Sequence, residues 1–389
     1  MSPLEEHWLA LHLVEGLGAK TLSVLLEHFE DTASLLSASP KAISEASRVR
    51  PALAERIATA MDAPHLPLEI ERVKRNGARV IPMSAPEYPQ RLKGVNFPPV
   101  LLYCRGAMPE QESPVLAVVG TRNHTRYGER VVGDLISGLA DVLPPVVIVS
   151  GLARGIDSVA HSEALANGLP TLAILGGGLG RVYPKENLEL AQRVAEGGAL
   201  LSEFPMDARP LGRNFPVRNR VISGMSDAVL VVEAGEKSGA LITAGFAMNY
   251  QRPVFAVPGN LGQQASAGTN RLIHEGQAAL VRDAQDLLEA LAPGRGIGEG
   301  VLGVGAIDAG ILPAKARSVR EPGKAPSSVM KALEGEKKRI AEVLKVGPMH
   351  PDELSGELGL PIEKLIGLLL ELELSGDIYQ TSDNQYMLA

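Results

Sequence analysis

The chain has 389 residues, of which 45% are hydrophobic and 21% charged, and its formal net charge at pH 7 is −7. These values indicate a globular protein with more than one domain, and they argue against a uniformly basic nucleic-acid binder. The single cysteine, Cys104, excludes a disulfide framework and a cysteine-based zinc site. Acidic residues stand where a secretory signal would be basic, and no apolar run approaches the roughly 18 residues of a membrane span. We therefore expect a cytoplasmic protein with no membrane partner.

Residues 1–66 carry apolar side chains at helical spacing, which predicts a helical domain. The stretch Gly16-Leu17-Gly18 interrupts this pattern. It is compatible with a helix-hairpin-helix turn, whose backbone amides hold a phosphate, and equally with a plain αα-hairpin that turns at a glycine. The glycine spacing alone does not decide between the two.

Residues 67–292 alternate short apolar runs with helical stretches. Between 113 and 292 six runs end in small or polar residues: VLAVVG, PVVIVSG, TLAILGG, ALLSEF, AVLVVEA and PVFAVPG. Two further strands, joined by a proline-rich loop, are expected in residues 67–112. This βαβ rhythm predicts an α/β fold with a Rossmann-like, doubly wound, mostly parallel sheet that helices cover on both faces.

The C-terminal part changes composition twice. Residues 293–333 are rich in Gly, Pro, Lys and Arg, carry a net charge of +3 and predict a flexible linker. Residues 334–389 predict three helices and a β-ribbon, the pattern of a winged helix, with a net charge of −6. The third helix carries Glu363, Glu371 and Glu373 against Lys364, so a polyanion repels it. We expect this domain to contact a protein, or the basic surface of another subunit, unless it is only a spacer.

The loops that follow the predicted strands share glycines and basic or amide side chains. Carboxyl ends of parallel strands meet at one edge of a sheet, where glycines admit backbone amides to a ligand and helix N-termini attract anions. The stretch NFPVRNRVISGMS, residues 214–226, adds two guanidiniums and two carboxamides just ahead of the strand VLVVEA. We interpret them as part of a phosphate-binding edge; for any single arginine, a salt bridge or a solubilising surface position is the alternative. The candidate residues are Gly120, Thr121, Arg122, Gly151, Arg154, Lys185, Asn214, Arg218, Asn219, Arg220, Ser238 and Gly239.

Motifs for catalysis are weak by comparison. The dinucleotide fingerprint GxGxxG, the P-loop GxxxxGK[ST] and the GxSxG elbow are absent. Ser150, Asp157 and His161 have the composition of a triad, but Asp157 and His161 are four apart at one helix start, a spacing more typical of a structural pair or a cap. We therefore expect no catalytic residue, no metal and no cofactor. Four aromatic residues in or beside the loops either stack on bases or fill the core: Tyr127, Tyr183, Phe204 and Phe215.

At this point the strand-end motifs resemble those of a known family. In order along the chain, VVGTRNHTRYG, SGLARGIDSVAH, LGGGLGRVYPKEN, NFPVRNRVISGMSDAVLVVEAGEKSGALITA and RPVFAVPG resemble the motif series of the DNA-processing protein A family, also called DprA or Smf. The terminal regions are similar to that family's SAM-like and winged-helix domains. The resemblance implies a protein that binds single-stranded DNA without cutting it and acts in natural transformation. It further implies that the protein protects incoming strands, loads the RecA recombinase onto them and forms a homodimer through the sheet domain.

The resemblance also assigns roles to residues. It places DNA binding on Arg122, Lys185, Arg218, Arg220 and the strand-end glycines, and Arg154 keeps a positive charge where lysine is common in the family. The sheet domain is also similar to phosphoribohydrolases that carry a PGGxGT loop, so a nucleotide-processing hydrolase is the alternative function. This chain has AGEKSGALITA at that place, without the hydrolases' catalytic glutamate, which favours binding over hydrolysis.

Overall fold

The computed structural model describes residues 1–47, 49–95, 97–141, 144–291, 327–345, 349–374, 377–380 and 385–388. Most of the linker predicted at 293–333 lies outside the described residues. Helix α15 (Ser327–Leu344) begins inside the predicted linker, so the C-terminal helical unit starts earlier in the chain than expected.

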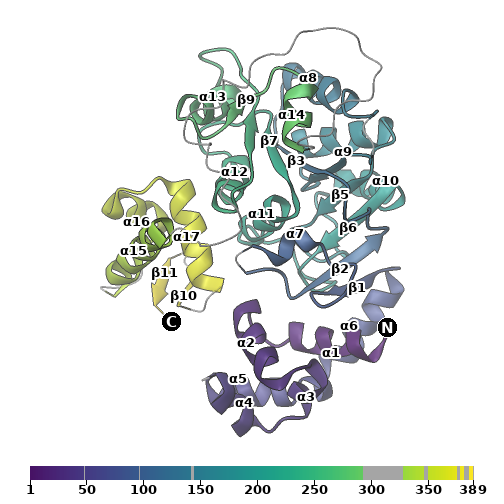
Figure 1. Cartoon of the computed structure of the whole chain (residues 1–389), viewed down its shortest axis with the longest axis vertical. Coiled ribbons are helices and arrows are strands. Elements are labelled where there is room, and N and C mark those ends of the chain that lie inside the picture. Colours follow the sequence, from purple (N-terminus) through teal and green to yellow (C-terminus); the bar gives the residue numbers. More distant parts are fainter. Residues whose placement is uncertain are drawn as a thin grey trace.

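A nine-stranded sheet forms the centre of the chain (Figure 1), in the order β1-β2-β6-β5-β4-β3-β7-β8-β9. Neighbouring strands from β6 through β5, β4, β3, β7 and β8 to β9 pair in parallel, whereas β1, β2 and β6 pair antiparallel at one edge. The mostly parallel sheet is confirmed, and residues 67–112 supply the two expected extra strands. The strands are β1 (Arg79–Pro82), β2 (Leu101–Gly106), β3 (Val115–Val119), β4 (Val147–Ser150), β5 (Thr171–Ile174), β6 (Gly198–Ser202), β7 (Ala228–Val231), β8 (Val254–Ala256) and β9 (Ala279–Leu280).

Helices bury both faces of the sheet. In β3, Val115, Ala117 and Val119 pack into one cluster with α11 and α12, whereas Leu116 and Val118 pack into the other with α8 and α9. Successive side chains of a strand point to opposite faces, so a strand buried on both sides is apolar throughout. The helices here are α7 (Gln90–Lys93), α8 (Arg126–Ser137), α9 (Ile156–Ala166), η2 (Lys185–Asn187), α10 (Leu188–Gly197), α11 (Asn214–Met225), α12 (Gly239–Asn249), η3 (Gln264–Ser266), α13 (Ala267–His274) and α14 (Ala284–Leu291).

Helix α11 corrects the interpretation of the stretch at 214–226. The sequence suggested a polar strand-end loop, but residues 214–225 are helical. Pro216 stands in the first turn, where a missing N–H leaves no intrahelical hydrogen bond unmade. Because the stretch is helical, its polar side chains point in several directions. Arg218 and Arg220 therefore lie in different surroundings.

The N-terminal helices share a hydrophobic core with the sheet. Leu9 and Leu25 belong to the same buried cluster as Leu101 of β2 and Leu200 of β6. The predicted boundary after residue 66 falls inside α6, so the helical segment runs directly into the sheet domain. Gly16, with φ of +84°, makes the turn between the first two helices. The helices are α1 (Pro3–His12), α2 (Ala19–Phe29), α3 (Thr32–Ser37), α4 (Pro40–Ser47), α5 (Pro51–Ala58), η1 (Ala60–Asp62) and α6 (His65–Arg75).

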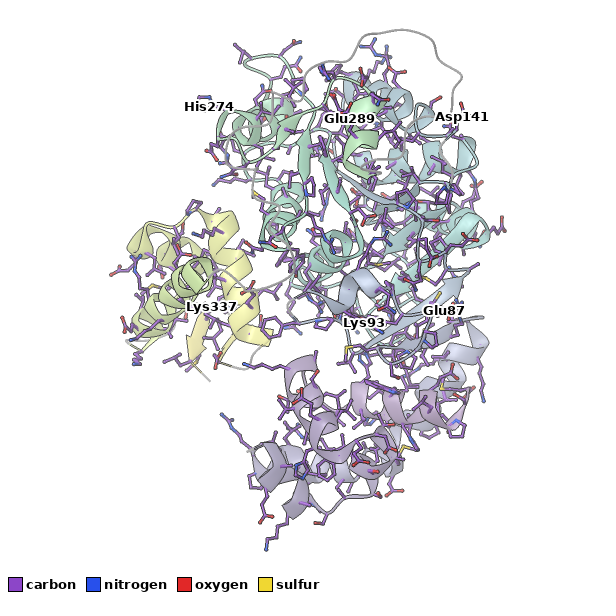
Figure 2. All side chains as sticks on the ribbon, in the orientation of Figure 1. Glu87, Lys93, Asp141, His274, Glu289 and Lys337 are labelled. Carbon is purple, nitrogen blue, oxygen red and sulfur yellow. The ribbon has the colours of Figure 1, made fainter. Side chains whose placement is uncertain are left out.

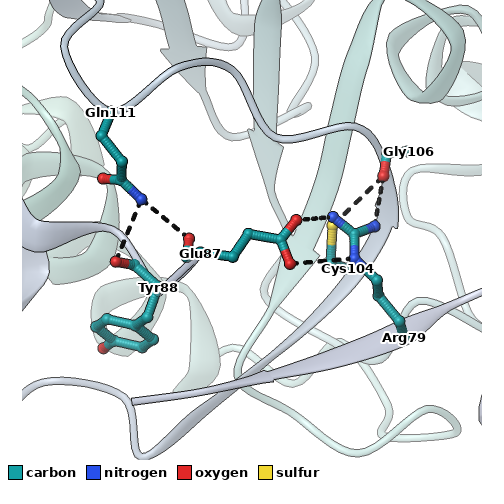
Figure 3. Close-up of polar contacts among 6 residues, drawn as sticks. All are labelled: Arg79, Glu87, Tyr88, Cys104, Gly106 and Gln111. Carbon is teal, nitrogen blue, oxygen red and sulfur yellow. Dashed lines mark hydrogen bonds and ion pairs between the residues drawn. The ribbon is translucent and has the colours of Figure 1, made fainter. Parts of the chain in front are cut away.

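Polar contacts hold the loop between β1 and β2 (Figure 3). Glu87 forms an ion pair with Arg79 of β1, whose guanidinium also donates a 2.6 Å hydrogen bond to the carbonyl oxygen of Gly106 in β2. The side-chain amide of Gln111 donates to the carbonyl oxygens of Glu87 at 3.1 Å and Tyr88 at 3.4 Å. These contacts fix the antiparallel edge of the sheet.

The C-terminal unit has its own core and confirms the predicted winged helix. Three helices and an antiparallel ribbon enclose Ile340, Leu354 and Leu365. Figure 1 shows this unit beside α11 and α12. Among all the helices of the described residues, none is long and apolar enough to cross a membrane. The elements after α15 are α16 (Pro351–Leu358), α17 (Ile362–Leu374), β10 (Ile378–Gln380) and β11 (Tyr386–Leu388).

Candidate nucleic-acid interface

A large open cavity lies at the carboxyl ends of β3 and β7. Strands β4, β5 and β6 lie on one side of β3, and β7, β8 and β9 lie on the other, so the winding direction of the sheet changes here. Doubly wound folds bind ligands at this switch point. The cavity, which we name the strand-end cavity, has a volume of about 1250 Å³. The polar and aromatic residues that line it include Gly120, Thr121, Arg122, Asn123, Phe215, Arg218, Asn219, Lys237, Ser238, Gly239, Asn260, Gln263 and Gln264.

More than half of the predicted site residues line this cavity. They come from the loop after β3, from α11 and from the N-terminus of α12, which are distant in the chain. Asn219 links two of these segments, because its side-chain amide donates to the carbonyl oxygen of Gly239 at 3.3 Å. The residues concerned are Gly120, Thr121, Arg122, Arg218, Asn219, Ser238 and Gly239.

Glu233, just after β7, holds the loop that carries Arg122. The carboxylate of Glu233 accepts hydrogen bonds from the Thr125 amide at 2.8 Å and from the Thr125 hydroxyl at 2.6 Å. The carbonyl oxygen of Glu233 accepts from the Thr121 amide at 2.7 Å. Thr125 in turn caps α8 by accepting from the Gly128 amide. Fixed contacts of this kind position a binding loop before any ligand arrives.

Glycine allows the loops after β3 and β4 to touch. Gly155 has φ of +78°, and a Cβ at this position would lie 2.2 Å from the carbonyl oxygen of Thr121. A Cβ at Gly120 would lie 2.6 Å from the side chain of Ile156. Neither position accommodates a side chain without moving the backbone, which explains two of the glycines in the strand-end motifs.

Arg122 is an exposed cation of the rim. Its guanidinium carbon lies 5.5 Å from the ring centroid of Phe215, in the first turn of α11. Phe215 is half-buried, and the ring of Tyr183 lies 6.2 Å away. Arg122 and Phe215 line both the strand-end cavity and a smaller neighbouring pocket. The guanidinium lies over the ring, and a cation stacked on an aromatic ring suits a phosphate and its attached base.

Arg218 forms part of the cavity floor rather than its rim. Its side chain is buried, and it donates hydrogen bonds to the carbonyl oxygens of Gly151, at 2.6 Å, and Ile174. Burial lowers the pKa of Arg218 to about 10, and the carboxylate of Asp157 opposes that shift. The guanidinium remains charged at neutral pH. It therefore contributes a positive potential from below, while part of its hydrogen-bonding capacity is used within the protein.

Arg220 and Asn214 do not line the cavity, contrary to expectation. Arg220 is buried, forms an ion pair with Glu203 and donates to the carbonyl oxygen of Phe97 at 2.7 Å. Asn214 starts α11, and its side-chain amide donates to the carbonyl oxygen of Arg209 at 3.2 Å. Arg220 therefore occupies a structural salt bridge, which was the alternative to a phosphate-binding position.

Other predicted site residues line the smaller pocket next to the strand-end cavity. Gly151 and Arg154 line it together with Arg122. The exposed Arg154 side chain forms an ion pair with Glu186, and the neighbouring Lys185 is exposed at the start of η2. Arg154 therefore lies beside the strand-end cavity rather than inside it, and Lys185 is among the lining residues of neither pocket.

The residues with triad composition are not arranged as a triad. The Ser150 hydroxyl donates to the carbonyl oxygen of Val118 at 2.6 Å, and His161 Nδ1 lies 2.7 Å from the Thr171 hydroxyl. Asp157 accepts from the backbone amides of Gly151 and Ala153, so it caps the loop before α9. Burial lowers the pKa of His161 to about 3. These contacts match the structural interpretation of the pair.

Several lining residues were not among the predicted ones. Lys237 and the amide-rich loop after β8, with Asn260, Gln263 and Gln264, border the strand-end cavity. Their position after a predicted strand was visible in the sequence, but their exposure toward the cavity was not. Among the described residues, no group of three or more His, Cys, Asp or Glu side chains is placed to hold a metal ion.

The sheet with its switch-point cavity and the appended winged helix define a doubly wound α/β protein. Residues 79–292 match the family model of DNA recombination-mediator protein A, and residues 324–384 match that of the DprA winged helix domain. The chain therefore belongs to the DNA recombination-mediator protein A family, which confirms the resemblance inferred from the motifs.

Individual relatives agree with this assignment. The chain is 33% identical to Protein Smf of Synechocystis sp. over 395 residues, covering 98% of each protein. It is 41% identical to DNA processing protein DprA of Bacillus subtilis over 229 residues, which cover 59% of this chain and 76% of the relative. The X-ray structure of DNA processing protein A from Streptococcus pneumoniae superposes with a TM-score of 0.64 at 36% identity, covering 74% of this chain and 97% of that one.

Proposed function

We propose that this chain binds single-stranded DNA along the rim of the strand-end cavity, as a recombination mediator in natural transformation. In this proposal the protein protects incoming strands, loads the RecA recombinase onto them and acts as a homodimer joined through the sheet domain. It binds DNA without catalysing a reaction on it. The family membership supports a role in DNA processing, and the finer assignment extends what the motifs of the family imply.

The observation that carries the proposal is the pairing of Arg122 with Phe215 at the mouth of the cavity. The guanidinium offers two parallel hydrogen bonds to a phosphate, and the stacked guanidinium and ring together offer a surface to a base. A duplex hides its base faces within the stack, so this pairing favours a single strand. Lys237 and the N-terminus of α12 add positive potential on the opposite wall.

The hydrolase alternative has weaker support from the same cavity. The carboxylates among its lining residues are Asp157 and Glu236. Asp157 is buried and accepts two backbone hydrogen bonds, whereas Glu236 is exposed at the start of the α12 loop. A hydrolase of nucleoside monophosphates needs a carboxylate held against the reacting sugar, and neither side chain is held in that way.

The test is a pair of titrations on the full chain. A labelled oligothymidylate and a duplex of equal length are titrated with protein under one salt condition, and bound fractions are read by anisotropy. We expect clear preference for the single strand. Equal affinity for the duplex would remove the single-strand assignment, and release of free base from a nucleoside monophosphate would support the hydrolase instead.

A further inference from the structure

Helix α17 of the winged helix is buried on two opposite sides. Leu365, Leu368 and Leu369 point into the winged-helix core. Leu370 and Glu371 are each only 6% exposed, although neither belongs to that core. An α-helix turns by 100° per residue. Around the axis of α17, the mean direction of Leu370 and Glu371 therefore lies roughly 160° from that of the three core leucines. Lys337 of α15 contacts Glu371 within the same unit, so it is the burial of Leu370 that calls for a covering element outside the winged-helix core.

The covering elements are α12 and α11 of the sheet domain. Both helices lie outside the winged helix, and α17 packs against both of them (Figure 1). On α12, Ala240 and Ala244 face the sheet, whereas Phe246 lies outside that cluster and is nevertheless only 2% exposed. The ring of Phe246 stacks on Tyr250 with centroids 6.1 Å apart. Phe246 therefore marks a side of α12 that faces away from the sheet core, whereas Tyr250 also packs against the sheet cluster.

Charges at the contact agree with the packing. Glu371 forms a 2.8 Å ion pair with Lys337 of α15, a residue labelled in Figure 2. Burial raises the pKa of Tyr250, and the Glu371 carboxylate acts in the same direction, against the opposing charge of Arg220. The Glu371 carboxylate therefore lies close enough to the Tyr250 hydroxyl to influence it electrostatically, although the two belong to different domains. Lys337 neutralises a carboxylate that would otherwise be buried without a partner.

We propose that α17 is a protein-docking helix whose partner is the α11–α12 side of the sheet domain in the same chain. In winged-helix proteins that read DNA, the third helix enters the major groove. Here that helix carries three glutamates, and the side opposite its own core contacts the sheet domain instead of being free for DNA. The docked domain in turn shields Phe246 from solvent. None of the described α17 side chains lines the strand-end cavity, so this role is separate from DNA binding.

The test measures the distance between the two helices in the full chain. Spin labels are attached at Met248→Cys on α12 and Lys364→Cys on α17, both exposed positions, whereas the native Cys104 is buried and does not compete for label. Electron–electron resonance should give one narrow distance peak. Leu370→Asp places a carboxylate in the contact, so the narrow peak should be lost. Leu68→Asp, at a leucine 52% exposed on α6, is the matched control and should keep the peak.

A second variant guards against simple unfolding of the winged helix. Phe246→Ala changes only the α12 side of the contact and should also remove the narrow peak. Rapid hydrogen exchange in residues 349–358 would show that Leu370→Asp unfolds the winged helix. In that case the result for Phe246→Ala alone tests whether α17 docks on α12. A broad distribution in the parent protein, or a narrow peak that survives Phe246→Ala, would overturn the docking proposal.

Discussion

Arg218 donates a 2.6 Å hydrogen bond to the carbonyl oxygen of Gly151, and this contact ties α11 to the loop after β4 beneath the strand-end cavity. A Cβ at Gly151 would lie 2.4 Å from the same guanidinium, so the contact requires glycine. The positive charge next to Asp157 also offsets the cost of burying that carboxylate, whose pKa burial raises. Arg218 thus connects the stability of the cavity floor to its electrostatics.

Replacing Arg218 should first cost stability. Arg218→Ala leaves Asp157 buried without its countercharge, and we expect the free energy of unfolding to fall by about 3 kcal/mol. Gly151→Ala should act in the same direction, because the added methyl displaces the guanidinium. Urea unfolding monitored by circular dichroism measures both. An Arg218→Ala protein as stable as its parent, but unable to bind DNA, would instead identify Arg218 as a direct DNA contact.

Arg122 should behave in the opposite way. Its side chain is exposed, so Arg122→Ala should leave the unfolding curve unchanged while weakening single-strand binding about tenfold or more. Loss of one phosphate contact should also reduce the log–log salt slope of binding by about 0.7. Arg122→Lys should recover only part of the affinity, because an ammonium does not form the two parallel hydrogen bonds.

The control for this series is Arg130→Ala. Arg130 is an exposed arginine of α8 that lines neither pocket, so its removal changes net charge by the same amount without touching the rim. Equal losses of affinity for the Arg122 and Arg130 variants would indicate a diffuse electrostatic effect and would remove Arg122 from the site.

Arg220→Ala should destabilise the fold, because it leaves Glu203 buried without a partner; we expect a loss of about 3 kcal/mol. The double variant Arg220→Met with Glu203→Gln should regain much of this stability, since both charges are then absent. Single-strand affinity of the folded double variant should stay close to that of the parent. Strong loss of DNA binding in that stable double variant would show that Arg220 acts on DNA after all.

The sequence predicted the sheet well because its strands are buried on both faces and therefore appear as apolar runs ended by small or polar residues. It also located the cavity, because strand order places the strand-end loops together. It could not assign the two arginines of α11. On a helix, Arg218 and Arg220 stand about 200° apart, so one lies under the cavity and the other reaches Glu203. Treating the stretch as a loop hid that difference.

The contact between α17 and α12 was equally invisible. Both helices are apolar on more than one side, and the sequence shows that such helices are buried without showing against what. The acidic composition of the winged helix did favour a protein contact over DNA. Identifying α12 as the covering surface required the burial of Leu370 and Phe246 in three dimensions.

Acid should destabilise the protein partly through His161. The unfolded imidazole binds a proton near pH 6.5, whereas burial lowers the folded pKa to about 3. Between these values the unfolded state holds the extra proton, so stability falls as pH falls, by at most about 1.4 kcal/mol per pH unit from this residue. His161→Gln should flatten the decline in urea midpoint between pH 6.5 and 4.5. His12, with a folded pKa of about 4, contributes the same trend in both proteins and cancels in the comparison. Parallel pH profiles would exclude this role for His161.

Removing the winged helix should change DNA binding little. The segment 334–389 has a net charge of −6, and α17 is turned toward α12 and α11, so we expect a chain ending at residue 326 to bind single strands within about threefold of the full chain. A second truncation, ending at residue 291, controls for the basic stretch between the two domains, which by itself attracts phosphates without specificity. Both truncated proteins lack the domain that covers Phe246, so self-association is checked by sedimentation before each titration. A loss of affinity well beyond threefold on going from the full chain to residue 326 would mean that the winged helix touches DNA despite its charge, and α17 would then have to leave α12 to do so.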